Sequence, residues 1–150
     1  MDRIYIDTCV FNRPFDDQIR YDIRLEAEAK IYIQEKIKDG KLELIWSYIL
    51  EYENSVNPFL VRKLAIVRWK NIARIHIIEN ETVLLLAKRI KALGLKSKDA
   101  LHIACGIYGK ADFFITTDKK ILKKLIDYDE INIINPVDFV IEIEGRNYDY

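Results

Sequence analysis

Apolar residues along this chain fall into short runs that are typical of strands, and between them lie longer stretches with the spacing of amphipathic helices. Strands are expected at 3–6, 41–46, 75–78, 113–116 and 131–134. Helices are expected at about 21–38, from 48 to an interruption at Asn57 and Pro58, from 59 to 72, and after Asn80, Ser97, Asp118 and Asn135.

Local signals add detail to two of these helices. In the helix at 59–72, one apolar stripe is expected to face the core, and it consists of Val61, Ala65, Trp69 and Ile72. Asn80 and Ser97 are predicted N-caps, because a side-chain oxygen at that position accepts a hydrogen bond from a free amide of the first helical turn.

Strands that alternate with helices predict an α/β domain built on a mostly parallel central sheet. The 150 residues contain no repeat, low-complexity tract or linker, so we expect a single domain at 1–144 and a loose tail at 145–150. In parallel sheets, ligands gather beyond the carboxyl ends of the strands. Polar residues that follow the strands are therefore the first candidates for function.

Composition narrows the class of protein. Lys plus Arg balances Asp plus Glu at 24 each, which argues against a generally basic nucleic-acid binder but is compatible with a basic rim around an acidic site. The sequence shows no signal peptide and no apolar run near 18 residues, so we expect a cytoplasmic protein without a membrane span. Cys9 and Cys105 lack metal-site spacing and are interpreted as reduced core residues.

Acidic residues collect at the predicted carboxyl ends of the strands. They are Asp7 after the first strand, Glu51 and Glu53 on the helix after the second, Asp99 in the first turn of the helix from 97, and Asp118 after the strand at 113–116. Each has an ordinary explanation: Asp7 as a turn residue, Asp118 as an N-cap, Asp99 as an acid favoured by the helix dipole, and either glutamate as a solvated side chain.

The joint placement of these acids favours a cation site. Carboxylates gathered without a matching base repel one another, and a divalent cation removes that repulsion. Ligands that are all oxygen suit Mg²⁺ or Mn²⁺. Such ions polarise phosphoryl groups and activate water, which is what hydrolysis of a phosphodiester requires.

Three stretches resemble the Asp-centred motifs of PIN domains, a family of small metal-dependent ribonucleases that includes VapC-type toxins. They are IYIDT at 4–8 with Val10 after it, KDALHIA at 98–104 and FITTD at 114–118. The resemblance implies a three-layer α/β/α fold and Mg²⁺ or Mn²⁺ held by Asp7, Asp99 and Asp118. It also implies hydrolysis of RNA to a 5′-phosphate and a 3′-hydroxyl.

The family's remaining glutamate commonly follows the second strand's terminal Ser or Thr by six residues, which selects Glu53 when counted from Ser47. Glu51 stays as the alternative, and the two cannot both face the site because they point about 200° apart on a helix. The family's frequent acid three residues after the last aspartate is Ile121 here, so a second metal site lacks that ligand and the number of ions stays open.

Further residues are assigned by the resemblance or by proximity to the acids. Thr8, Thr116, Arg13 and Lys119 are the candidate substrate contacts, although Thr116 equally suits an ordinary place in a strand. His102 is expected to be a packed or surface histidine rather than a substrate contact.

Other functions fit the residues less well. A haloacid-dehalogenase-type phosphatase needs a second acid where Cys9 stands, and the order of acids in a receiver domain is absent. A PIN-like scaffold that binds RNA or protein without cleavage is the alternative to the metal-dependent endoribonuclease. If the protein is a toxin, the resemblance implies an antitoxin as partner, and homodimers are common in the family.

Overall fold

The computed structural model describes residues 1–147, and a five-stranded sheet with the order β3-β2-β1-β4-β5 forms its centre. Every neighbouring pair of strands is parallel. The strands are β1 (Asp2–Ile6), β2 (Leu42–Ser47), β3 (Ile75–Ile77), β4 (Phe113–Ile115) and β5 (Asn132–Ile134). All five therefore present their carboxyl ends at the same edge of the sheet.

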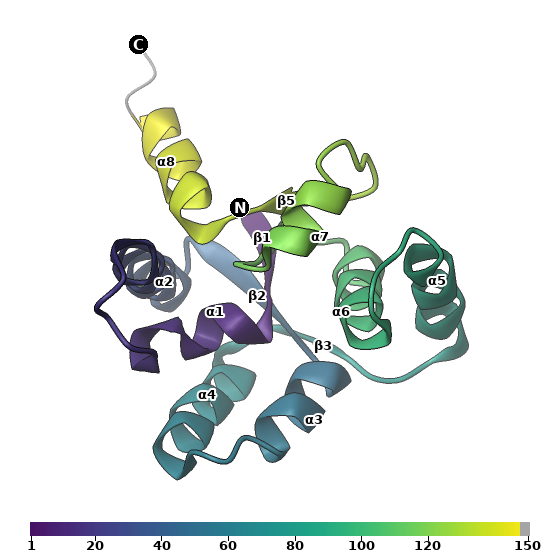
Figure 1. Ribbon diagram of the computed structural model, residues 1–150, viewed down its shortest axis with the longest axis horizontal. Coiled ribbons are helices and arrows are strands. Elements are labelled where there is room, and N and C mark those ends of the chain that lie inside the picture. Colours follow the sequence, from purple (N-terminus) through teal and green to yellow (C-terminus); the bar gives the residue numbers. More distant parts are fainter. Residues whose placement is uncertain (148–150) are drawn as a thin grey trace.

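Helices cover both faces of this sheet (Figure 1), with α2 and α8 on one side and α5 and α6 on the other. The helices are α1 (Thr8–Asn12), α2 (Tyr21–Lys38), α3 (Tyr48–Ser55), α4 (Leu60–Ile72), α5 (Glu81–Lys91), α6 (Ser97–Tyr108), α7 (Lys119–Lys124) and α8 (Pro136–Asn147), with a 3₁₀ turn, η1, at Arg13–Phe15. The predicted three-layer α/β/α architecture is confirmed.

Strand β1 lies at the centre of the sheet and is buried on both faces, as strands covered by helices on each side must be. Ile4 and Tyr5 are fully buried, and Ile6 is 1% exposed. The Tyr5 ring stacks on that of Phe114 in β4, with centroids 5.3 Å apart. This packing fixes the end of β1, and hence the position of Asp7, which follows it.

Most predicted elements are confirmed, and the expected Asn80 cap is present because its Oδ1 accepts the Val83 amide at 3.0 Å. The Ser97 cap is wrong. Ser97 is the first residue of α6, and Lys96 occupies the N-cap without a side-chain hydrogen bond. The extended backbone at Lys96 comes directly after the buried Leu95, so the helix begins one residue earlier than a capping serine requires.

The apolar stripe predicted for α4 is wrong in part. Trp69 is buried as expected, but the other buried residue of the helix is Ile66, whereas Val61 is 74% exposed and Ile72 is 37% exposed. Trp69 faces α2, where the ammonium of Lys30 lies 5.0 Å from its ring centroid. Contact with α2 therefore sets which side of α4 is covered, and several apolar residues are left outside.

The C-terminal helix is longer than expected. Helix α8 runs to Asn147, so residues 145–147 are helical rather than loose. Arg146 explains this extension, because its guanidinium pairs with Asp2 at the start of β1 and with Glu142 one turn earlier. The rest of the expected tail, residues 148–150, lies outside the described residues.

Within residues 1–147, no helix combines the length and the apolar character needed to cross a bilayer.

Candidate active site

Asp7 lies at the carboxyl end of β1, where its amide donates to the Ile115 carbonyl at 2.9 Å. Its side chain is 6% exposed and is held by neutral groups on both oxygens. Oδ1 accepts the Thr8 amide at 2.8 Å, and Oδ2 accepts the Thr116 hydroxyl at 2.8 Å and the Cys9 thiol at 3.5 Å. These groups orient the carboxylate without neutralising it.

The two candidate glutamates of α3 point to different surroundings, as their spacing requires. Glu53 Oε1 accepts the Thr8 hydroxyl at 2.8 Å and also pairs with His102 Nε2. Glu51 instead accepts the Trp46 indole N–H at 2.9 Å. The fold thus brings Glu53 next to the residue that follows Asp7, and it directs Glu51 elsewhere.

His102 is packed rather than at the surface, with 1% exposure, which is one of the two places expected for it. Its Nδ1 lies 2.6 Å from the Tyr5 hydroxyl, which lies 2.6 Å from Ser47 Oγ. Nε2 faces Glu53 on the other side of the ring. The imidazole thus links the Tyr5 hydroxyl to Glu53, and one chain of hydrogen bonds reaches from the sheet to the acid.

Burial and the contact between Glu53 and His102 shift the pKa of each of these side chains in opposite directions. Burial alone raises the pKa of Glu53, but the hydrogen bond and charge of His102 outweigh it and hold the pKa below its ordinary value. Burial lowers the pKa of His102, but the contact with Glu53 and the charge of Asp7 outweigh that effect and raise it. Both directions favour an ionised Glu53.

Asp118 and Asp99 complete the acidic edge. Asp118 is the N-cap of α7, with Oδ1 accepting the Lys120 amide at 2.9 Å, while its own amide donates to Thr116 Oγ1 at 3.0 Å. Asp99 lies in the first turn of α6. Burial raises the pKa of Asp99, and the charges of Asp7 and Asp118 raise it further. The three aspartates are therefore close enough to repel one another.

Asp99 and Asp118 line a cleft of about 370 Å³ between α7 and the segment that precedes α6. The other side chains around it are mostly cationic. They are Lys96, Lys120, Lys123 and Lys124, together with Gly94 and Leu95. The segment before α6 and helix α7 are far apart in the sequence, so the fold is what places these lysines together beside the acids.

The donor chemistry of this edge fits a hard divalent cation, because all four acids offer carboxylate oxygens. In residues 1–147, none of the four forms a salt bridge with Lys or Arg. In the same part of the chain, no three His, Cys, Asp or Glu side chains stand close enough to hold an ion as placed. Hydrogen bonds to His102, Thr116 and the first turn of α7 orient Glu53, Asp7 and Asp118.

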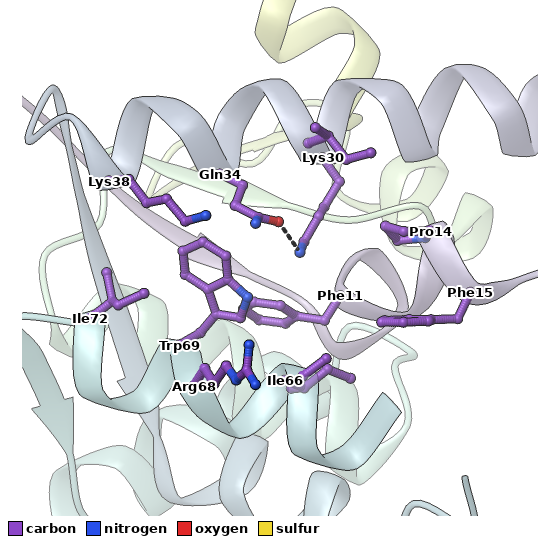
Figure 2. A pocket seen from close by; sticks show the side chains of 12 residues that line it. Phe11, Pro14, Phe15, Lys30, Gln34, Lys38, Ile66, Arg68, Trp69 and Ile72 are labelled. Carbon is purple, nitrogen blue, oxygen red and sulfur yellow. Dashed lines mark hydrogen bonds between the residues drawn. The ribbon is translucent and has the colours of Figure 1, made fainter. Parts of the chain in front are cut away.

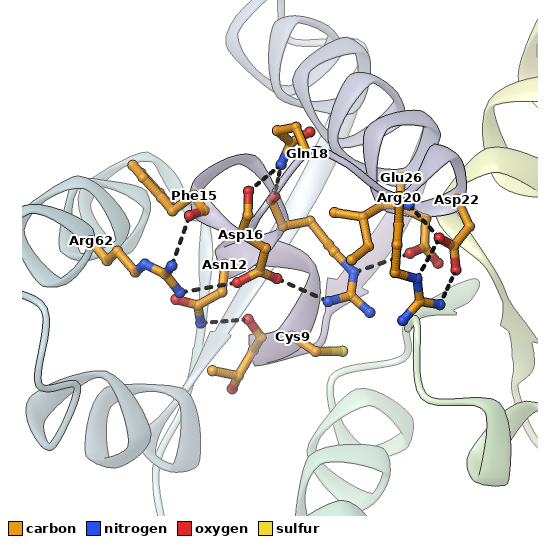
Figure 3. Close-up of polar contacts among 12 residues, drawn as sticks. Cys9, Asn12, Phe15, Asp16, Gln18, Arg20, Asp22, Glu26 and Arg62 are labelled. Atoms are coloured by element: carbon orange, nitrogen blue, oxygen red, sulfur yellow. Dashed lines mark hydrogen bonds and ion pairs between the residues drawn. The ribbon is translucent and has the colours of Figure 1, made fainter.

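The predicted substrate contacts divide into two groups. Thr8 and Thr116 both bond to the acids, and the exposed Lys119 directly follows Asp118. Arg13 is engaged elsewhere: its guanidinium binds Asp16 at 2.9 Å and Glu26 at 3.0 Å. Figure 3 shows Asp16 and Glu26 within this network, in which Arg62 binds the other oxygen of Asp16.

A second pocket lies between α2 and α4 and has a volume of about 220 Å³. Figure 2 shows Lys30 reaching into it beside Phe11 and Trp69, with its ammonium 2.7 Å from the Gln34 side-chain oxygen. Burial, and to a lesser extent the charge of Lys38, lowers the pKa of Lys30 to about 8. None of the four carboxylates lines this pocket, so it is separate from the acidic edge.

Comparison with known proteins adds an independent observation. Residues 4–126 match the family model of the PIN domain. The fold is similar to that in the crystal structure of FitAcB from Neisseria gonorrhoeae, with a TM-score of 0.58 and 16% identity over 89% of this chain and 97% of that one. It is also similar to VapBC2 from Rickettsia felis bound to a DNA fragment from their promoter, with a TM-score of 0.54 and 12% identity over 89% of this chain and 98% of that one. No curated protein matches the chain.

Proposed function

Because the chain belongs to the PIN domain family, we propose that it is an endoribonuclease that uses Mg²⁺ or Mn²⁺. The proposed ligands are Asp7, Glu53, Asp99 and Asp118. The observation that carries the proposal is a set of acids at the carboxyl edge of a parallel sheet that, among residues 1–147, have no Lys or Arg in a salt bridge with them. A divalent cation bound among these acids would remove the repulsion between them.

When bound, the metal supplies charge stabilisation of a phosphoryl group and lowers the pKa of water. The protein's own residues orient the ligands. Thr116 holds Asp7 through its hydroxyl and receives the amide of Asp118 on the same oxygen, so one side chain sets the spacing of two acids. Thr8 and His102 both bind Oε1 of Glu53, so among residues 1–147 Oε2 has no hydrogen bond that would compete with a ligand.

We further propose a toxin of a toxin–antitoxin pair, with an antitoxin and a second copy of the chain as partners. The similarity to FitAcB and VapBC2 supports this assignment. The surface also supports this assignment, because five apolar residues on α4 and the segment before it are each more than half exposed. They are Val56, Phe59, Leu60, Val61 and Leu64. Free thiols at Cys9 and Cys105 agree with a cytoplasmic location.

The direct test is cleavage of an end-labelled single-stranded RNA by the purified protein with Mn²⁺, Mg²⁺ or EDTA. We expect cleavage with either metal, none with EDTA, and a loss of about 10³-fold in Asp7→Asn, the scale of a removed catalytic charge. Asp2→Asn, at the opposite edge of the sheet, is the matched control and is expected to keep its activity. Absence of metal-dependent cleavage, or full activity of Asp7→Asn, refutes the proposal and leaves a PIN-like scaffold.

A further inference from the structure

The cleft beside Asp99 and Asp118 lies between two segments of the chain that Lys124 joins. One wall is α7 and the other is the segment from Gly94 to Lys96 that leads into α6. Lys124 joins the two walls, because its ammonium donates to the Gly94 carbonyl at 2.6 Å. A Cβ at Gly94 would stand 2.6 Å from that ammonium, and the backbone φ there is +99°, so glycine is needed to seat the lysine.

The remaining three lysines of the cleft, Lys96, Lys120 and Lys123, are exposed. Among residues 1–147, none of them has a carboxylate within salt-bridge distance. Lys120 and Lys124 stand four residues apart on α7, where like charges repel. The fold therefore gathers four lysines around a cleft that also contains Asp99 and Asp118, and within residues 1–147 none of these lysines is held by a salt bridge.

This positive charge adjoins the acids of the proposed active site. Lys96 lies three residues before Asp99, and both line the cleft. Asp118 caps the helix that carries Lys120 and Lys123. A chain of phosphates whose reacting member lies at the acids would therefore meet the lysines at the neighbouring positions.

We propose that this cleft holds the backbone of the RNA strand next to the phosphate that is cut, with Lys96, Lys120 and Lys123 binding its phosphates. The inference rests on the proposed function and adds to it the path of the substrate. Lysine ammoniums act as point charges that bind phosphate without reading bases. The cleft thus contributes to the affinity for RNA, whereas recognition of the RNA sequence depends on other residues.

The opposite edge of the sheet contains a natural control. A cleft of about 320 Å³ is lined there by Lys36 and Lys41, and its acid, Asp2, is paired with Arg146. The two lysines lie at the end of α2 and before β2, away from the carboxyl ends of the strands. Removing two positive charges here changes the net charge equally without touching the proposed substrate path.

The experiment compares Lys120→Gln/Lys123→Gln with Lys36→Gln/Lys41→Gln. Cleavage of a 12-nucleotide RNA with Mn²⁺ gives KM and kcat, and fluorescence anisotropy of the same RNA on the Asp7→Asn background gives affinity as a function of KCl. For the cleft variant we expect KM to rise about tenfold with kcat within about twofold. The slope of log affinity against log salt should become shallower by about 1.4, or about 0.7 for each lysine that no longer neutralises a phosphate of the single strand.

A third variant, Lys96→Gln, tests the other wall and should lower the slope by about 0.7. Melting curves check that all variants fold. If wild type cleaves RNA and the cleft variants match the Lys36/Lys41 control in KM and salt slope, the inference is overturned while the proposed function stands. If wild type does not cleave RNA at all, the proposed function fails and the inference falls with it.

Discussion

The two edges of the central sheet hold acidic residues by different means. At the amino edge two acids have basic partners: Asp2 pairs with Arg146, and Glu43 binds the Arg3 guanidinium at 2.7 Å. The backbone amide of Arg3 also donates to Asp112 at 2.8 Å. Such pairs fasten a helix and neighbouring strands together, and each contributes little energy because it is partly exposed.

At the carboxyl edge the acids are held by hydroxyls, a thiol, backbone amides and an imidazole. Asp7 is the most buried of them at 6% exposure, yet its partners are neutral. These neutral groups orient the carboxylate without forming a salt bridge to it. Other acids near this edge have basic partners, such as Glu51 with Lys70 and Glu26 with Arg13, but within residues 1–147 none of the four proposed metal ligands has a Lys or Arg in a salt bridge.

The largest contrast is expected from removing one charge at each edge. Asp118→Asn should lower RNA cleavage about 10³-fold with little change in the melting temperature, because asparagine caps a helix as well as aspartate does. Glu43→Gln, at the amino edge, should leave cleavage within about twofold. Initial rates and melting curves measure both, and equal rates for the two variants contradict the distinction between the edges.

A smaller effect is expected from the hydrogen bonds that orient Glu53. His102→Asn and Tyr5→Phe should each weaken Mn²⁺ binding by about 10- to 100-fold, the scale for partners that orient a metal ligand. His76→Asn is the control, because within residues 1–147 that ring bonds only to the Ala73 carbonyl. Calorimetric titration with Mn²⁺ measures the affinities.

With only two histidines in the chain, ¹⁵N spectra also report the ring state of His102 directly. We expect a hydrogen on Nε2 and a signal that moves in Tyr5→Phe. Unchanged Mn²⁺ affinity in both variants contradicts a positioning role.

The smallest effect concerns stability and pH. In the fold, burial and then Asp7 and Asp118 raise the pKa of Asp99 above its ordinary 3.8, so the native state binds this proton more tightly than the unfolded chain does. Stability is therefore lost as pH rises from about 4 through the raised pKa. In EDTA at pH 7.5, Asp99→Asn should melt about 1–3 °C above wild type, a modest gain because the group is half-exposed.

The difference in melting temperature between Asp99→Asn and wild type should shrink toward pH 4, where the Asp99 carboxyl is protonated in both the folded and the unfolded state. Saturating Mn²⁺ should reverse the sign of this difference. Differential scanning calorimetry at several pH values measures it. An Asp99→Asn variant that is less stable than wild type in EDTA at pH 7.5 contradicts repulsion at this edge.

Much of the fold could be predicted because its signals are local. A four-residue repeat that includes Ile33 and Ile37 predicts helix α2 at its observed bounds. The side of α4 that is covered could not be predicted, since contact of Trp69 with α2 decides it and apolar residues lie on both sides of that helix.

The candidate site likewise contains residues that the sequence could locate and contacts that it could not. Asp7 and Asp118 follow strands, so the pattern locates them, and counting from Ser47 selects the glutamate that the fold directs to Thr8. The chain of Ser47, Tyr5 and His102 joins three separate elements and leaves no mark on local spacing. Sequence proximity alone links Arg13 to Asp7, whereas its actual partners are Asp16 and Glu26.

The central claim is that the acids of the carboxyl edge bind a divalent cation, and the melting temperature as a function of Mn²⁺ concentration tests it most directly. At 100 times the dissociation constant we expect about 2.7 kcal/mol of stabilisation, or roughly 5–10 °C for a chain of this size. The shift should disappear in Asp7→Asn/Asp118→Asn and persist in Asp2→Asn. A wild-type melting temperature that does not respond to Mn²⁺, or a shift that survives in the double variant, contradicts the account.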